Sequence, residues 1–168
     1  MANSITVSLD DLHALIVRIL VAHNTAPSIA EQVAKALVAA EADDQKGHGA
    51  SRVPSYAGQS RSGKVNGHAE PEMIDLGGGG AIVDAHDGFA YPAIALAQET
   101  LRDKLKVSPI AAVSIRNTHH SGVVGHHIEP LADDGFIAIS MGNGPQAIAI
   151  KPDRKNGTMM AEAALIPA

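Results

Sequence analysis

Residues 81–117 read AIVDAHDGFAYPAIALAQETLRDKLKVSPIAAVSIRN, and this stretch decides the fold class. Ala81–Asp84 and Ile110–Ile115 are short runs of apolar, largely β-branched residues, which predicts two strands, the second of them buried. The segment between them, from about Pro92 to Lys106, is predicted to be a helix with proline in its first turn. Strands interleaved with a helix predict a mixed α/β lobe.

The same alternation continues on both sides of this stretch. We expect a strand over Glu72–Leu76, a turn over Gly77–Gly80, a helix over Gly122–Asp133 and a strand over Phe136–Met141 that Gly142–Pro145 breaks. Ile150–Ala168 begins with polar residues, and Thr158–Ile166 is expected to form one weak helix.

The N-terminal third is expected to be helical throughout. Ser8 can cap a first helix, and Ser28 with Glu31 forms a capping-box pattern at the start of a second helix that ends near Asp43. A third helix is expected over Pro54–Arg61. The predicted class is therefore α+β, with a helical lobe over residues 1–70, an incomplete mixed α/β lobe over 71–149 and a divergent tail over 150–168.

Composition excludes several classes of function. Thirteen Lys and Arg against eighteen Asp and Glu give a net charge of −5, which argues against nucleic-acid binding. The absence of cysteine excludes disulfide scaffolds, zinc–thiolate sites and cysteine nucleophiles. The apolar run Leu12–Ala22 is interrupted by His13 and Arg18, so no membrane span is expected, and no signal peptide is recognisable at the N-terminus. We therefore expect a soluble, cytoplasmic protein.

Histidine is the most informative residue type, with nine in the chain. Four lie within nine residues: His119, His120, His126 and His127. One interpretation is an acid/base histidine in the loop after the strand that ends at Arg116, because a rigid strand positions such a loop. The alternatives are surface histidines and a metal site, although neighbouring side chains point apart and at most two of the four would share a site.

A second candidate segment runs from Gly47 to Tyr56. His48 lies between two glycines, where backbone can approach a ligand closely. Arg52 and Tyr56 are four residues apart and would project from one face of a helix. An arginine there suits a small carboxylate, which its guanidinium can bind through two parallel hydrogen bonds, and the alternative is an exposed arginine at a helix N-terminus.

Other motifs argue against alternative chemistries. Gly77–Gly80 lies between two strands with no helix directly after it, so it lacks the context of a dinucleotide fingerprint, and no P-loop pattern is present. The serines lack the nucleophile-elbow pattern, so serine hydrolysis is unsupported.

The His48–Tyr56 segment, Arg116–Gly122 and Gly135–Pro145 together resemble the malate/L-lactate dehydrogenase family of the second type. These are non-Rossmann, NAD(P)-dependent 2-hydroxyacid oxidoreductases, among them malate, sulfolactate and ureidoglycolate dehydrogenases and reductases of pyrroline- and piperideine-2-carboxylate. The resemblance extends from about residue 5 to residue 149. It implies NAD or NADP as cofactor, a small 2-hydroxy, 2-oxo or 2-imino acid as substrate, and no resident metal.

The resemblance also implies roles for individual residues. His120 and His48 are the expected catalytic residues, with His120 exchanging a proton with the substrate and lying beside the cofactor. Arg52 would bind the substrate carboxylate, and Tyr56 would orient the substrate together with His48. The expected cofactor contacts are completed by Asn143 and Gly144. The chain departs from the family pattern where Gly47 replaces a serine and Ser121 replaces an aromatic residue.

The family's members are much longer than this chain, and Ile150–Ala168 aligns with none of their segments. We interpret the chain as truncated, with impaired activity and an exposed strand edge that favours a homo-oligomer, a dimer in the simplest case. The alternatives are a catalytically inactive remnant domain and a histidine-cluster metal-binding module.

Overall fold

The computed structural model describes the backbone of residues 5–144 and 160–166 and the side chains of residues 5–142. The chain forms two compact units, Met1–Gly122 and Val123–Ala168. The lobe boundary predicted at residue 70 falls inside the first unit and stays a prediction.

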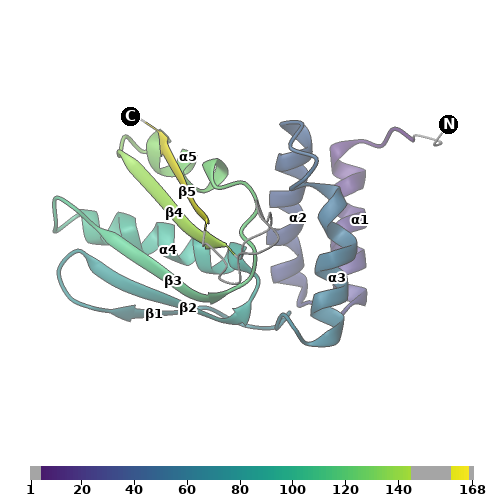
Figure 1. The fold of residues 1–168 in the computed structure, drawn as a ribbon, viewed down its shortest axis with the longest axis horizontal. Coiled ribbons are helices and arrows are strands. Elements are labelled where there is room, and N and C mark those ends of the chain that lie inside the picture. The colour runs from purple at the N-terminus through teal and green to yellow at the C-terminus, as the bar shows by residue number, and fades with distance from the viewer. Residues whose placement is uncertain (1–4, 145–159, 167–168) are drawn as a thin grey trace, which may run out of the picture. The chain divides into compact units, whose positions relative to one another are not determined.

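The first unit begins with three helices, α1 (Leu9–Ala22), α2 (Pro27–Ala42) and α3 (Val53–Ser62) (Figure 1). Ser8 caps α1 as predicted, because its hydroxyl accepts the backbone N–H of Asp11 at 3.0 Å. The capping box predicted for α2 is wrong: the helix begins at Pro27 after Ala26, with no side-chain cap. Proline starts this helix because its fixed φ suits the first turn and its missing N–H needs no partner there.

The core of the helical part is mainly aliphatic, and the aromatic residues Tyr56, Phe89 and Tyr91 belong to the same buried cluster. Ile16 and Leu20 of α1 pack against Leu37 of α2, and all three side chains are almost completely buried. Tyr56 of α3 belongs to the same cluster and is only 2% exposed. This packing fixes the helix that carries one of the predicted site residues.

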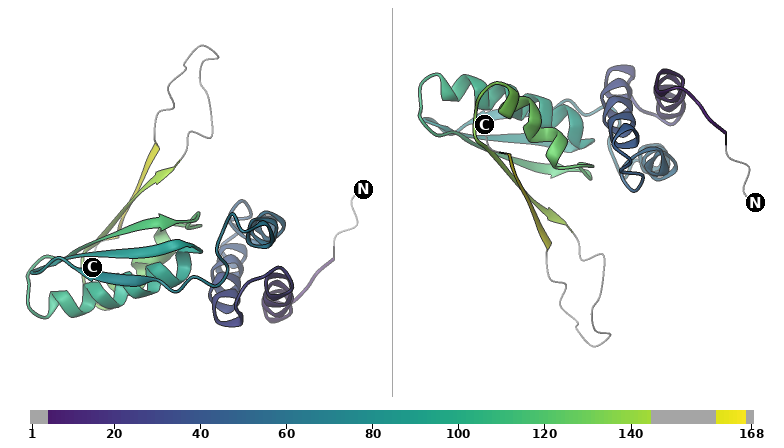
Figure 2. Two further views of the ribbon diagram at one scale, coloured as in Figure 1. Left: turned by 90° about the horizontal axis from the view of Figure 1, so that it is seen from below. Right: turned by 90° about the horizontal axis from the view of Figure 1, so that it is seen from above.

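The rest of the first unit is a three-stranded sheet with a helix on one face (Figure 2). β2 (Gly80–Gly88) pairs antiparallel with β1 (Glu72–Asp75) and parallel with β3 (Ala112–Thr118). The connecting helix α4 (Ala90–Leu105) packs on β2 and β3 through a small apolar cluster: Val83, Ala85, Ala93 and Ala97, with Leu96, Val113 and Ile115 at its margin.

The prediction that the strand after Ile110 is buried is wrong. β3 alternates exposed and half-buried residues up to Ile115 and is exposed from Arg116 to Thr118. The alternation arises because α4 covers one face of the strand, so Val113 and Ile115 are sheltered while their neighbours in sequence point the other way. Apolar composition alone could not distinguish one covered face from two.

The ends of β2 and β3 depart from regular geometry. Asp84 pairs with Arg116, but the next pair is Gly88 with Thr118, so β2 contains a bulge between them. Left-handed backbone occurs within this region at three non-glycine residues, with φ of +50° at His86, +58° at Asp87 and +51° at Asn117.

The second unit contains α5 (Gly125–Asp133) and an antiparallel pair formed by β4 (Ala138–Gly144) and β5 (Met160–Ile166) (Figure 1). Two predictions fail here. Gly142–Gly144 do not break the strand but continue its pairing with β5. The weak helix expected over Thr158–Ile166 is wrong, because residues 160–166 form β5; pairing with β4 overrides their helix propensity.

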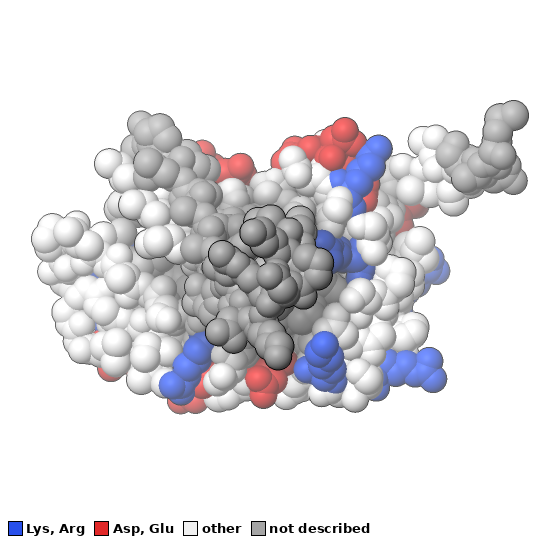
Figure 3. All heavy atoms as spheres, viewed as in Figure 1, with Lys and Arg blue, Asp and Glu red and all other residues white. Residues whose placement is uncertain are grey.

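Charged side chains of both signs are interspersed on the face shown in Figure 3. Within the described parts of the chain, no helix combines the length and the apolar character that crossing a bilayer requires.

Candidate active site

The loop before α3 places His48 and Arg52. The chain leaves α2, passes through Gly47–Gly49 and enters a short 3₁₀ helix, η1 (Ala50–Arg52). The carboxylate of Glu41 accepts the Ala50 N–H at 2.7 Å and so caps this turn. A Cβ at Gly49 would collide with that carboxylate, which explains why the residue after His48 is glycine.

Tyr56 connects the helical part to the loop after β3. Its side chain is buried, and its hydroxyl lies 2.8 Å from Nδ1 of His120 and 3.4 Å from the hydroxyl of Tyr91 on α4. Burial raises the pKa of Tyr56, and it raises the pKa of Tyr91 further. Both phenols therefore stay protonated around neutral pH and can serve as hydrogen-bond donors.

The hydrogen bonds to His120 fix its tautomer. The backbone N–H of Gly122, which can only donate, lies 3.2 Å from Nδ1. Nδ1 is consequently an acceptor in this arrangement, and the proton of the neutral ring is on Nε2. The Tyr56 hydroxyl then also donates to Nδ1, while Tyr91 donates to Tyr56.

Gly122 makes this arrangement possible. Its φ is +73°, and a Cβ at this position would lie 2.8 Å from the hydroxyl oxygen of Tyr91. Any other residue would meet both backbone strain and a collision. Neither Gly122 nor Tyr91 has a role predicted from the sequence, although Tyr91 is one of only four aromatic residues in the chain, a scarcity that marks it out.

His48 and His120, which are far apart in the sequence, lie side by side in space. Their rings are nearly parallel, with an interplanar angle of 5° and centroids 5.6 Å apart. Nδ1 of His48 is buried and has no hydrogen-bond partner among the described residues. The structure thus brings together both predicted catalytic histidines and Tyr56.

Arg52 belongs to the same cluster. Its Nε donates to the carbonyl oxygen of Gly47, and its positive charge acts on both Tyr56 and Tyr91, where it opposes the pKa increase that burial causes. A half-buried guanidinium whose charge acts on Tyr56 can bind a small anion, while the imidazole of His120, the hydrogen-bond partner of Tyr56, can exchange a proton.

His119 has different surroundings from its neighbour. Its ring packs edge-on against Tyr56 and Phe89, and its backbone N–H donates to the Gly88 carbonyl at 3.1 Å. Burial, followed by the charges of His120 and Lys64, lowers the pKa of His119 to about 4. This histidine is neutral at physiological pH and serves as packing.

The predicted cofactor residues Asn143 and Gly144 lie in β4, in the second unit, where their backbone pairs with Ala161 and Met160. Their side-chain surroundings lie outside the described residues. In the part of the chain that the structure describes, no group of three or more His, Cys, Asp or Glu residues could hold a metal ion.

Comparisons with known proteins place the chain in a family. The model of the malate/L-lactate dehydrogenase family matches residues 7–156, so the chain belongs to this family of dehydrogenases. The match continues past residue 149, where the resemblance was predicted to end. Residues 150–156 are therefore part of the family region, and the prediction that the whole tail matches nothing is wrong.

Individual relatives agree with the family match. The chain is 39% identical over 138 residues to a Δ1-pyrroline-2-carboxylate/Δ1-piperideine-2-carboxylate reductase of Pseudomonas syringae pv. tomato, covering 82% of this chain and 40% of the relative. It is 38% identical over 143 residues to a (2R)-3-sulfolactate dehydrogenase (NADP(+)) of Chromohalobacter salexigens, covering 85% of this chain and 43% of the relative. The chain spans about two fifths of the length of these relatives.

A solved structure shows the same fold. The crystal structure of Δ1-piperideine-2-carboxylate reductase from Pseudomonas syringae superimposes with a TM-score of 0.83 and 35% sequence identity, covering 93% of this chain and 47% of that one. The α+β class predicted from the sequence is confirmed.

Proposed function

We propose that the protein transfers a hydride between a nicotinamide nucleotide, NAD or NADP, and the 2-carbon of a small 2-oxo or 2-imino acid. The observation that carries the proposal is the cluster of His48, Arg52, Tyr56 and His120, which groups an anion-binding side chain with histidines that can exchange a proton. The names of the relatives support the same class of reaction.

Arg52 and His48 are proposed to bind and orient the acid. The guanidinium offers donors to a carboxylate, and the buried Nδ1 of His48 offers an unused polar atom beside it, as judged among the described residues. With the carboxylate fixed, the 2-oxo or 2-imino group would meet the exposed ring of His120.

His120 is proposed to give the Nε2 proton of its doubly protonated ring to the 2-oxo or 2-imino group, which leaves the ring neutral with its remaining proton on Nδ1. In the reverse direction Nε2 takes the proton back. Its Nδ1 is held by Tyr56, whose hydroxyl can either donate to or accept from that nitrogen, so the anchor follows the ring through a change of protonation. A nicotinamide would supply the hydride when bound. His120 is exposed, so a nicotinamide could lie against its ring. Asn143 and Gly144 remain its other proposed contacts.

Self-association is a further part of the proposal. Ile137, Ile139 and Met141 occupy alternate positions along one face at β4 and are 74%, 62% and 75% exposed. A row of exposed apolar side chains on a strand favours association with another copy of the chain, a homodimer in the simplest case.

The test follows oxidation of NADH and NADPH with pyruvate, oxaloacetate and Δ1-pyrroline-2-carboxylate. Because the chain spans two fifths of its relatives, it is assayed alone and in a chimera in which residues 7–144 replace the matching segment of the Pseudomonas syringae reductase. In the chimera, His120→Ala should lower kcat by about 100-fold or more, whereas His13→Ala on α1 should leave it unchanged. Turnover that survives His120→Ala would overturn the proposal.

A further inference from the structure

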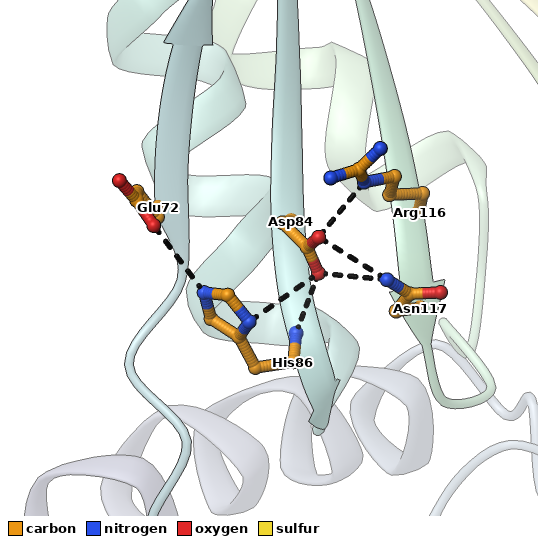
Figure 4. A network of polar contacts seen from close by, with 5 residues as sticks. All are labelled: Glu72, Asp84, His86, Arg116 and Asn117. Atoms are coloured by element: carbon orange, nitrogen blue, oxygen red, sulfur yellow. Dashed lines mark hydrogen bonds and ion pairs between the residues drawn. The ribbon is translucent and has the colours of Figure 1, made fainter.

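A buried carboxylate joins the ends of β2 and β3 just before the loop that carries His120 (Figure 4). Asp84 is 5% exposed, and it is surrounded by donors. Nε of Arg116 donates to Oδ2 at 2.8 Å, the side-chain amide of Asn117 donates to the two oxygens at 3.0 and 3.1 Å, and the His86 backbone N–H donates to Oδ1 at 3.0 Å.

Two of these donors belong to residues in left-handed backbone. His86 has φ of +50° and Asn117 has φ of +51°, and an L-residue adopts this conformation at a cost unless something holds it there. Asp84 accepts hydrogen bonds from both residues. One carboxylate therefore stabilises the bulge in β2 and the left-handed conformation of Asn117 in β3. Beyond these residues the strands meet again, where Gly88 pairs with Thr118 and accepts the His119 N–H.

We propose that Asp84 is a positioning residue that acts through Asn117 to set the place of the His120 ring. Only two residues lie between Asn117 and His120, whose Nδ1 has to meet both the Tyr56 hydroxyl and the Gly122 N–H. A change in the backbone dihedrals of Asn117 moves the loop and breaks both contacts. The catalytic meaning of this placement rests on the proposed function, but the placement itself does not.

The role requires a carboxylate rather than a similar polar group. Two oxygens serve three donor groups, and these hydrogen bonds, with the Arg116 charge, lower the pKa of Asp84 to about 2. In Asp84→Asn, one oxygen becomes an NH₂ group that faces the N–H donors of Arg116 and Asn117. The shape is kept, while Asn117 loses one of its two acceptors and the negative charge that attracts its amide. In the outer part of the network, Nε2 of His86 lies 3.6 Å from Oε2 of Glu72, and both side chains are exposed. This pair is not needed to position Asn117.

The experiment records the histidine ring ¹H–¹⁵N correlations of the 168-residue chain without substrate or nucleotide. In the unmodified chain, His120 should show a single tautomer with the proton on Nε2. Asp84→Asn and Asn117→Ala should each replace this signature by an averaged one. Arg116→Gln is the matched control, because it removes the positive charge beside the same carboxylate, keeps a donor at the position of Nε and should leave the His120 signature intact.

The signal of His13 on α1 reports whether each variant is folded. A His120 signature that stays unchanged in folded Asp84→Asn and Asn117→Ala would overturn the proposal, as would an equal loss in Arg116→Gln. If Asp84→Asn does not fold, the His120 signature of Asn117→Ala alone decides whether the proposal holds. In an active chimera, Asp84→Asn should lower kcat by about 10- to 100-fold with little change in KM. The ring spectra need no turnover, so failure of this proposal and failure of the proposed function are told apart.

Discussion

Replacing Gly122 by alanine should destabilise the first unit more than an ordinary glycine substitution does. The left-handed backbone at φ +73° costs an alanine about 1–2 kcal/mol. The added Cβ would also lie 2.8 Å from the Tyr91 hydroxyl oxygen, and relieving such overpacking costs about 1–3 kcal/mol. The expected loss in free energy of unfolding is therefore about 2–5 kcal/mol.

The chain offers a matched control in Gly63, at the end of α3. Its φ is +74°, and a Cβ there would meet nothing within 4 Å. Gly63→Ala thus carries the backbone cost alone, about 1–2 kcal/mol. The difference between the two variants, measured by urea unfolding followed by circular dichroism, isolates the collision with Tyr91.

A double variant makes the reasoning refutable. In Tyr91→Phe the hydroxyl is gone, and the ring carbons of residue 91 that lie nearest to the Gly122 Cβ position are 3.6 Å from it, an ordinary contact distance. In that background, Gly122→Ala should cost no more than Gly63→Ala. Equal losses for Gly122→Ala with and without the Tyr91 hydroxyl would show that the hydroxyl does not lie against Gly122.

Three further predictions concern the same unit. Tyr56→Phe should lower the free energy of unfolding by about 1–2 kcal/mol, measured by urea unfolding, because it removes the hydroxyl between His120 and Tyr91; an unchanged value would contradict that contact. The pKa of His119 is about 4 in the folded chain, below its ordinary value of 6.5, because the ring is buried. As the pH falls, the unfolded chain is therefore protonated at this residue before the folded chain is, and the free energy of unfolding should decrease between pH 6.5 and pH 4. His119→Phe should flatten that part of the stability profile, and an unaltered slope would argue against a buried neutral ring. Leu37→Ala, at a site with 0% exposure, should lower the free energy of unfolding by about 2–5 kcal/mol. Leu15→Ala, on the half-exposed face of α1, should lower it only a little. Similar losses for the two variants would contradict the assigned core.

The elements with a local signal were predictable from the sequence. Ser8 before an apolar helix pattern marks a helix start through local hydrogen bonding, and it caps α1 in the structure. The third helix, expected over Pro54–Arg61, is likewise found as α3, which ends at a left-handed Gly63. β5 was not predictable, because residues 160–166 take their strand conformation from pairing with β4. The burial of β3 was misjudged for a similar reason, since it depends on where α4 lies.

The residues of the candidate site could be proposed from the sequence, whereas the contacts between them could not. Spacing drew attention to His48, Arg52 and His120, and the family resemblance connected them. That the two histidine rings lie parallel, or that Tyr56 holds Nδ1 of His120, depends on contacts between segments far apart in the sequence, which periodicity does not report. Asp84 was missed because a lone aspartate in a strand carries no motif. Gly122 belongs to the Arg116–Gly122 segment of the resemblance, but the sequence does not report its left-handed backbone or its contact with Tyr91.

The most direct test of the account is whether this cluster recognises a carboxylate next to a carbonyl. Pyruvate and its methyl ester are titrated separately into the 168-residue chain while the ring signals of His48 and His120 are followed. Pyruvate should shift both signals and the ester should not, and Arg52→Lys should weaken pyruvate binding by about 10- to 100-fold, because a point charge cannot replace a bidentate hydrogen-bonded pair. Equal responses to the acid and the ester, or pyruvate binding that Arg52→Lys leaves unchanged, would contradict the proposed site.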